Sequence, residues 1–117
     1  MAEDVFSTIR GGRTLTWEVE RLWELSEELP EKAVPIVALE HWLDEIVWFD
    51  EDTSPTARAV AEHSERIHSA DLEIPILLSA SGEVMDGMHR LAKAWMLGSD
   101  TILAKQFRTD PDPDWSE

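Results

Sequence analysis

The five consecutive residues from Asp86 to Arg90 combine the groups that a phosphate-binding turn requires. Gly87 permits a sharp turn from a strand into a helix, because glycine adopts positive φ without steric cost. His89 and Arg90 then lie in the first helical turn, where unpaired backbone N–H groups and the positive end of the helix dipole are found. Cations are disfavoured there unless an anion is nearby, and arginine donates paired hydrogen bonds to phosphate. The run Asp86-Gly87-Met88-His89-Arg90 therefore predicts an anion site, most naturally for phosphate.

Alternative roles for these side chains stay open at the level of the sequence. Asp86 either caps the helix, or holds Mg²⁺ or polarises a hydroxyl group as a catalytic residue. Arg90 either binds phosphate or pairs with one of the many carboxylates of the chain. His89 is also consistent with a neutral, partly buried histidine that is hydrogen-bonded to a backbone carbonyl.

The apolar periodicity and the turn residues around this run predict an α+β arrangement with a small sheet and packed helices. The predicted segments are an edge strand over 33–37 containing Pro35, a short helix or turn over 39–45, a helix from Ser54-Pro55 to Ser69, a hairpin of 74–80 and 83–86 around Ser81-Gly82, a helix over 89–97 stopped by Gly98, and a strand over 102–107. The inner face of the longest helix is predicted to carry Ala57, Val60, Ser64 and Ile67. Another face carries Arg58, Glu62 and Arg66, which favours pairing of either arginine with Glu62.

Both ends of the chain are predicted to lie outside this arrangement. Residues 1–13 are interpreted as a loose lead-in with Gly11-Gly12 as a flexible joint. Residues 14–30 predict an additional N-terminal helix, capped by Thr16 and spanning about 17–28. The tail over 108–117 is acidic and proline-rich, which predicts flexibility and no regular structure.

Composition narrows the class of protein. A length of 117 residues predicts a single domain over 1–117. A net charge of −15 argues against DNA binding, because proteins that bind nucleic acid neutralise phosphates with lysine and arginine. The chain lacks cysteine and any apolar run near the ~18 residues of a membrane span, so we expect no thiolate chemistry, no membrane contact and a cytoplasmic location. The four histidines lack the spacing of metal ligands, so no metal site is predicted.

Tryptophan is unusually frequent, with six copies in a chain that has no tyrosine. Five of them are predicted to fill the core, because each supplies a large apolar area: Trp17, Trp23, Trp42, Trp48 and Trp95. Trp48 is also a candidate for stacking on a nucleobase.

The turn at Gly87 resembles the nucleotide-binding hinge of the ParB/sulfiredoxin superfamily. ParB partition proteins carry Gly-Glu-Arg-Arg before a helix, sulfiredoxins carry Gly-Cys-His-Arg, and free-serine kinases carry Asp-Gly-His-His-Arg; the run here is Asp86-Gly87-Met88-His89-Arg90. The resemblance covers about residues 33–107. It implies a ParB/sulfiredoxin-like fold with a mixed sheet, and ATP or CTP, with Mg²⁺, held by Gly87, Met88, His89 and Arg90. It also implies that the preceding helix faces the nucleotide, so that Arg66 and Arg58 reach its phosphates.

The chain departs from these relatives in ways that limit its function. Met88 occupies the position of the sulfiredoxin cysteine, so cysteine-based reduction of sulfinic acids is excluded. We expect neither the second phosphate motif of ParB proteins, Asn-x-x-Arg, nor their helix-turn-helix, because the chain ends at Glu117. The net charge also argues against a centromere-binding partition protein.

Three hypotheses remain. The first is a small protein that binds ATP or CTP at the Gly-Met-His-Arg hinge. The second is an enzyme of the same fold, an ATP-dependent phosphotransferase or a nucleotide hydrolase, in which Asp86 or a carboxylate within 40–45 acts as the base. The third is a non-catalytic interaction protein whose acidic surface binds a basic partner or whose N-terminal helix pairs with a second copy. Stabilisation by nucleotide distinguishes the first two from the third.

Overall fold

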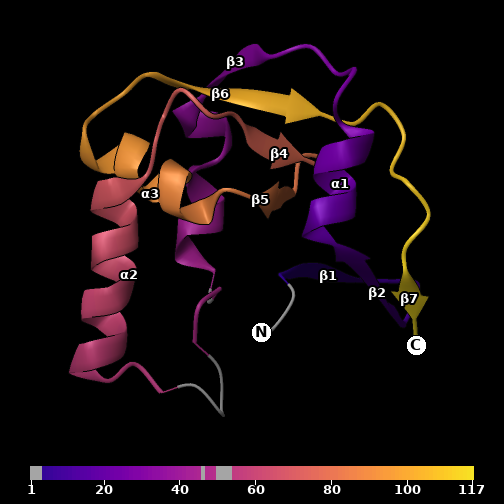
Figure 1. Ribbon diagram of the computed structural model, residues 1–117, viewed down its shortest axis with the longest axis horizontal. Helices are drawn as coiled ribbons and strands as arrows, with labels where there is room; N and C mark the ends of the chain where they lie inside the picture. Colours follow the sequence, from indigo (N-terminus) through magenta and orange to yellow (C-terminus); the bar gives the residue numbers. More distant parts are fainter. Residues whose placement is uncertain (1–3, 46, 50–53) are drawn as a thin grey trace.

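The computed structural model describes residues 4–45, 47–49 and 54–117, and in these residues it has an α+β fold with three α-helices and two small sheets (Figure 1). The first sheet has the strand order β1 (Val5–Arg10), β2 (Arg13–Glu18) and β7 (Trp115–Ser116). The second has the order β3 (Lys32–Pro35), β6 (Thr101–Gln106), β4 (Ile76–Leu78) and β5 (Val84–Asp86). The helices are α1 (Val19–Leu25), α2 (Ala57–Ser69) and α3 (Met88–Met96), with 3₁₀ turns η1 (Ile36–Ala38) and η2 (Glu40–Asp44). None of the described helices is long and apolar enough to cross a membrane.

The second sheet is mixed, because β4 runs parallel to β6 while β3 and β5 pair in antiparallel fashion. Its centre is β4, whose three residues are buried. Side chains alternate between the two faces of a strand, so Ile76 and Leu78 join the cluster under α3 and η1, and Leu77 joins a second cluster with Trp17 of the N-terminal hairpin. The predicted hairpin around Ser81-Gly82, the helix stopped by Gly98, the last strand and the edge position of β3 with Pro35 are confirmed.

The N-terminal predictions were wrong. Residues 1–13 were interpreted as a loose lead-in, yet β1 and β2 form an antiparallel hairpin that turns at Gly11 and Gly12, which have φ of 60° and 77°. Two successive residues of positive φ give a turn whose twist suits paired strands. Thr16 caps no helix and instead pairs with Trp115. The helix over about 17–28 is shorter than predicted, because the strand continues to Glu18 before α1 begins.

The acidic tail was also predicted wrongly, since it folds back over this hairpin and ends in β7. The carbonyl of Pro111 accepts a hydrogen bond of 2.8 Å from Nε1 of the buried Trp17. The carboxylate of Asp114 accepts one from the backbone N–H of Glu18 and pairs with Arg21. These long-range partners hold a segment that has little tendency of its own to form structure.

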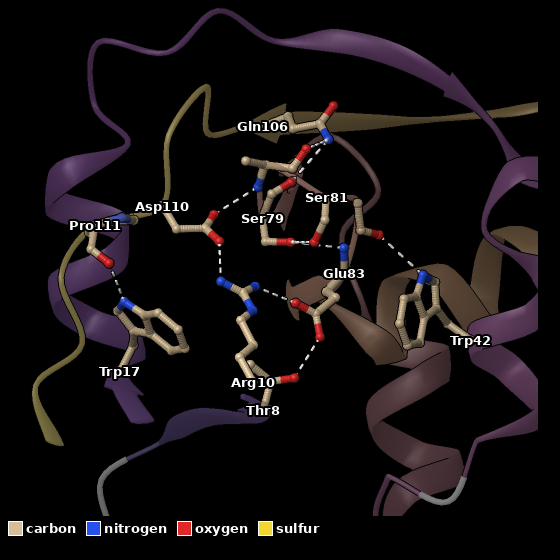
Figure 2. A network of polar contacts seen from close by, with 12 residues as sticks. Thr8, Arg10, Trp17, Trp42, Ser79, Ser81, Glu83, Gln106, Asp110 and Pro111 are labelled. Carbon is tan, nitrogen blue, oxygen red and sulfur yellow. Dashed lines mark hydrogen bonds and ion pairs between the residues drawn. The ribbon is translucent and has the colours of Figure 1, made fainter. Parts of the chain in front are cut away.

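A network around Arg10 connects the hairpin, the tail and the second sheet (Figure 2). The guanidinium lies between Glu83, at 2.6 Å, and Asp110, at 2.7 Å, and these hydrogen bonds raise the pKa of Arg10. Asp110 also accepts from the backbone N–H of Ala80, and Thr8 donates to the other oxygen of Glu83. The two sheets are therefore joined through one shared cation.

Two further predictions need correction. Helix α2 is capped by Thr56, whose side chain accepts from the backbone N–H of Ala59, and not by Ser54. None of its residues is fully buried, and the side that is partly covered contains Ala59, His63 and Ile67, whereas Val60 is 50% exposed. Trp95 is 54% exposed and does not belong to the core, unlike Leu91 and Ala94 of the same helix, which are buried.

Candidate functional site

Gly87 forms the turn from β5 into α3, and only glycine fits there. Its φ of 114° and ψ of 22° are left-handed. A Cβ atom at this position would lie 2.5 Å from Cγ2 and 2.8 Å from Cβ of Ile76, in the central strand β4. Backbone conformation and close packing therefore impose the same residue, as the sequence predicted. Helix α3 begins at Met88 without a side-chain cap, so Asp86 does not have the capping role that was one of its alternatives.

The start of α3 opens into a cavity of about 920 Å³. Its walls come from the hinge, from α2, from β1 and from the segment 47–48. The lining includes six of the seven residues that the sequence proposed for the site, namely Asp86, Gly87, Met88, His89, Arg90 and Arg66. Arg58, in the first turn of α2, is exposed and is not among the described residues that line it. The fold thus brings the hinge and Arg66 together, two turns of helix away from Arg58.

His89 is hydrogen-bonded to a second histidine, which the sequence did not single out. Nδ1 of His63 and Nε2 of His89 lie 2.9 Å apart. The indole of Trp48 stacks on both imidazoles, with ring centroids 4.6 Å from His63 and 4.4 Å from His89. Trp48, a candidate for stacking on a nucleobase, therefore already stacks on protein rings. His63 and His89, called the histidine pair below, join α2 to the first turn of α3.

The surroundings of the histidine pair favour the neutral form of both rings. Burial lowers the pKa of His89, and the neighbouring His63 and Arg66 lower it further. The pKa of His63 is lowered by its burial and then by Arg66. The positive charge of the cavity therefore comes from Arg66 and Arg90, and His89 contributes only hydrogen-bonding atoms.

Arg90 lies beside the carboxylate of Asp86, so the pairing that was an alternative to phosphate binding is present. Nη2 of Arg90 is 3.5 Å from Oδ2 of Asp86, and the same oxygen accepts a hydrogen bond of 2.8 Å from Nε1 of Trp23. The guanidinium lies 5.9 Å from the centre of the Trp23 ring. Nε of Arg90 is buried and has no hydrogen-bond partner among the residues that the structure describes. Asp86 and Trp23 thus fix the direction of Arg90 but leave part of its donor capacity unused.

Arg66 differs from Arg90 in its surroundings. It is exposed, and in the described part of the chain it forms no ion pair, so the predicted alternative of pairing with Glu62 is not observed there. An exposed arginine next to two neutral histidines leaves a positive charge that is available to an anion in the cavity.

The described residues include no group of three or more histidine, cysteine, aspartate or glutamate side chains able to hold a metal ion. Comparison of the chain with protein-family models, with curated proteins and with solved structures finds no match. The chemistry of the cavity therefore has to be argued from its own residues: an uncapped helix start, the two arginines Arg66 and Arg90, two imidazoles and the two carboxylates of Asp4 and Asp86.

Proposed function

We propose that the cavity at the start of α3 binds a nucleotide, ATP or CTP, through its phosphates. The observation that carries this proposal is that Arg66 and Arg90 line one cavity together with the uncapped first turn of α3. Backbone N–H groups at a helix start and arginine side chains are the two kinds of donor that proteins use for phosphate. A volume of about 920 Å³ falls in the range of sites for small molecules.

The same observations support placing the chain in the ParB/sulfiredoxin superfamily. That superfamily was inferred from a strand, a glycine hinge and a helix carrying histidine and arginine. In the structure Gly87 has the left-handed backbone that such a hinge needs, and the mixed order of β3, β6, β4 and β5 is compatible with the small mixed sheet that the resemblance implies.

We favour a binding protein over a phosphotransferase or hydrolase. Asp86 was the residue proposed as a base, and its Oδ2 accepts from Trp23 while it pairs with Arg90. A hydrogen bond and an ion pair at one oxygen stabilise the carboxylate as an anchor for the guanidinium. In this proposal Asp86 is a positioning residue, and Mg²⁺ accompanies the phosphates of the nucleotide.

Isothermal titration of the full chain with ATP, CTP, GTP and ADP, each with Mg²⁺, tests the proposal. We expect a triphosphate to bind and Arg66→Gln to weaken its binding about 10- to 100-fold, because a hydrogen bond to a charged group contributes about 1.5–3 kcal/mol. Arg58→Gln is the matched control, since it removes the same charge from the same helix outside the cavity.

Equal weakening by the two variants would mean that only net charge matters and would overturn the phosphate assignment. Absence of binding by all four nucleotides would favour the interaction protein instead. Release of ADP or inorganic phosphate on prolonged incubation would show turnover and overturn the preference for a binding protein.

A further inference from the structure

A second hollow, called the acidic hollow below, opens between η2, the segment 47–49 and α3 and has a volume of about 630 Å³. It shares Val47, Trp48 and Met88 with the cavity at the start of α3, called the hinge cavity below, so the two lie on either side of these residues. Its remaining described lining falls into an apolar part that includes Phe49, Trp95 and Met96 and an acidic part formed by Glu40, Asp44 and Glu45.

The apolar part contains large side chains that are exposed to solvent. Trp95 is 54% and Met96 55% exposed, although Leu91 and Ala94 of the same helix are buried. Large apolar side chains that stay together at the surface mark a binding site more often than an accident of composition. A ligand with an apolar body would remove these side chains from water.

The acidic part determines the charge of the ligand. Lysine, arginine and histidine are absent from the described lining, and none of the three carboxylates forms an ion pair within the described ranges. Carboxylates beside a poorly polarisable wall concentrate cations and repel anions. The faces of Trp48 and Trp95 add a further attraction for a cation placed over a ring.

We propose that the acidic hollow binds a small organic ammonium ion, in which a protonated amine is attached to an aromatic or aliphatic body. The body would pack against Phe49, Trp95 and Met96, and the ammonium group would face the carboxylates of Glu40, Asp44 and Glu45. The volume suits such a ligand, because small-molecule sites enclose about 300–1,000 Å³. This inference does not depend on nucleotide binding in the hinge cavity.

Three ligands that share one body and differ in charge test it: 2-phenylethylammonium, 2-phenylethanol and phenylacetate. Each is titrated into the full ¹⁵N-labelled chain, and the indole N–H signal of Trp95 is identified by its loss in Trp95→Phe. We expect the ammonium ion to shift this signal and the amide signals of residues 43–45. The alcohol should bind about fivefold more weakly, since exposed charge pairs contribute modestly, and phenylacetate should cause no shift.

A variant in which the three carboxylates are neutralised distinguishes the contribution of the acidic part to binding from that of the apolar part. Combining Glu40→Gln, Asp44→Asn and Glu45→Gln should weaken binding of the ammonium ion about fivefold and leave that of the alcohol unchanged. The control combines Glu20→Gln, Glu24→Gln and Glu28→Gln, which remove the same number of negative charges at exposed positions elsewhere.

Equal binding of the three ligands, an equal effect of the control, or shifts confined to other residues would overturn the proposal. A Trp95 signal that moves with protein concentration alone, together with a dimer in sedimentation, would assign the hollow to a second copy of the chain and overturn it as well.

Discussion

The imidazole rings of His63 and His89 are joined by a hydrogen bond of 2.9 Å between Nδ1 and Nε2, and their planes differ by only 9°. One nitrogen has to accept, so at least one of the rings is neutral whenever this bond exists. The bond links α2 to the first turn of α3 and thereby sets where Arg66 lies relative to Arg90. The geometry of the cavity thus depends on a bond that is lost when both histidines are protonated.

The first prediction concerns pH. The pKa of both histidines is lowered from the ordinary value of 6.5, chiefly by burial. As the pH falls through 6.5, the unfolded chain takes up protons that the folded chain does not, so the free energy of unfolding decreases. The double variant His63→Gln, His89→Gln removes this contribution. Its free energy of unfolding in urea should therefore fall less than that of the wild type between about pH 7.5 and 5.

The groups around the pair define the control for this experiment. Arg66 and Arg90 act against protonation, whereas Asp86 and Glu62 act in its favour, and all four remain in the variant. His68→Gln removes an exposed histidine of the same helix. If it changes the pH dependence as much as the double variant does, the histidine pair is not the cause.

The segments that the sequence predicted well are those with local signals. Ser81-Gly82, Gly87 and Gly98 mark turns through glycine, and each structural element between them was found within one or two residues of its predicted bounds. Near the ends of the chain, the local sequence favoured structures other than those that the long-range contacts impose. Thr16 was interpreted as a helix cap, although it lies in a strand whose partners include Trp115, far away along the chain.

The site shows the same division between local and long-range information. Asp86 to Arg90 lie together because they are consecutive, and the prediction that they form a turn with Gly87 at its centre needed nothing else. The contact between His63 and His89 spans 26 residues and exists only because α2 packs against α3. Nothing in the spacing of the histidines indicated it, and only packing of the complete fold could do so.

Gly87→Ala should be strongly destabilising. The side chain would have to adopt a φ of 114° and would meet Ile76 at 2.5 Å. Left-handed strain and overpacking in a core each cost about 1–3 kcal/mol, so we expect a loss of about 2–6 kcal/mol in the free energy of unfolding. Gly98→Ala also has positive φ, at 72°, but meets no atom within 4 Å. This control should lose only about 1–2 kcal/mol, and equal losses would contradict the close packing at Gly87.

Arg10→Met should loosen the connection between the two sheets. The variant leaves Glu83 and Asp110 without their shared cation. Because the arginine is 36% exposed, water compensates in part, and we expect a loss of about 1 kcal/mol that becomes smaller at high salt. Arg13→Met is the control on the same hairpin, where the only side-chain contact described is to the hydroxyl of Ser116. Urea unfolding at low and high salt should separate the two variants.

The last prediction concerns the tail and the carboxylate of Asp114, which is one of its contacts with the N-terminal hairpin and α1. Asp114 is 18% exposed, accepts a hydrogen bond of 2.8 Å from the backbone N–H of Glu18 and lies 3.0 Å from Arg21. Asp114→Ala leaves that N–H, at the start of α1, without its acceptor, so we expect a loss of about 1–2 kcal/mol and faster hydrogen exchange at Glu18. Asp112→Ala removes an exposed carboxylate of the same tail and should change neither measurement. If both variants leave the exchange at Glu18 unaltered, the tail does not hold the hairpin in solution, and the flexible tail that composition predicts would be correct after all.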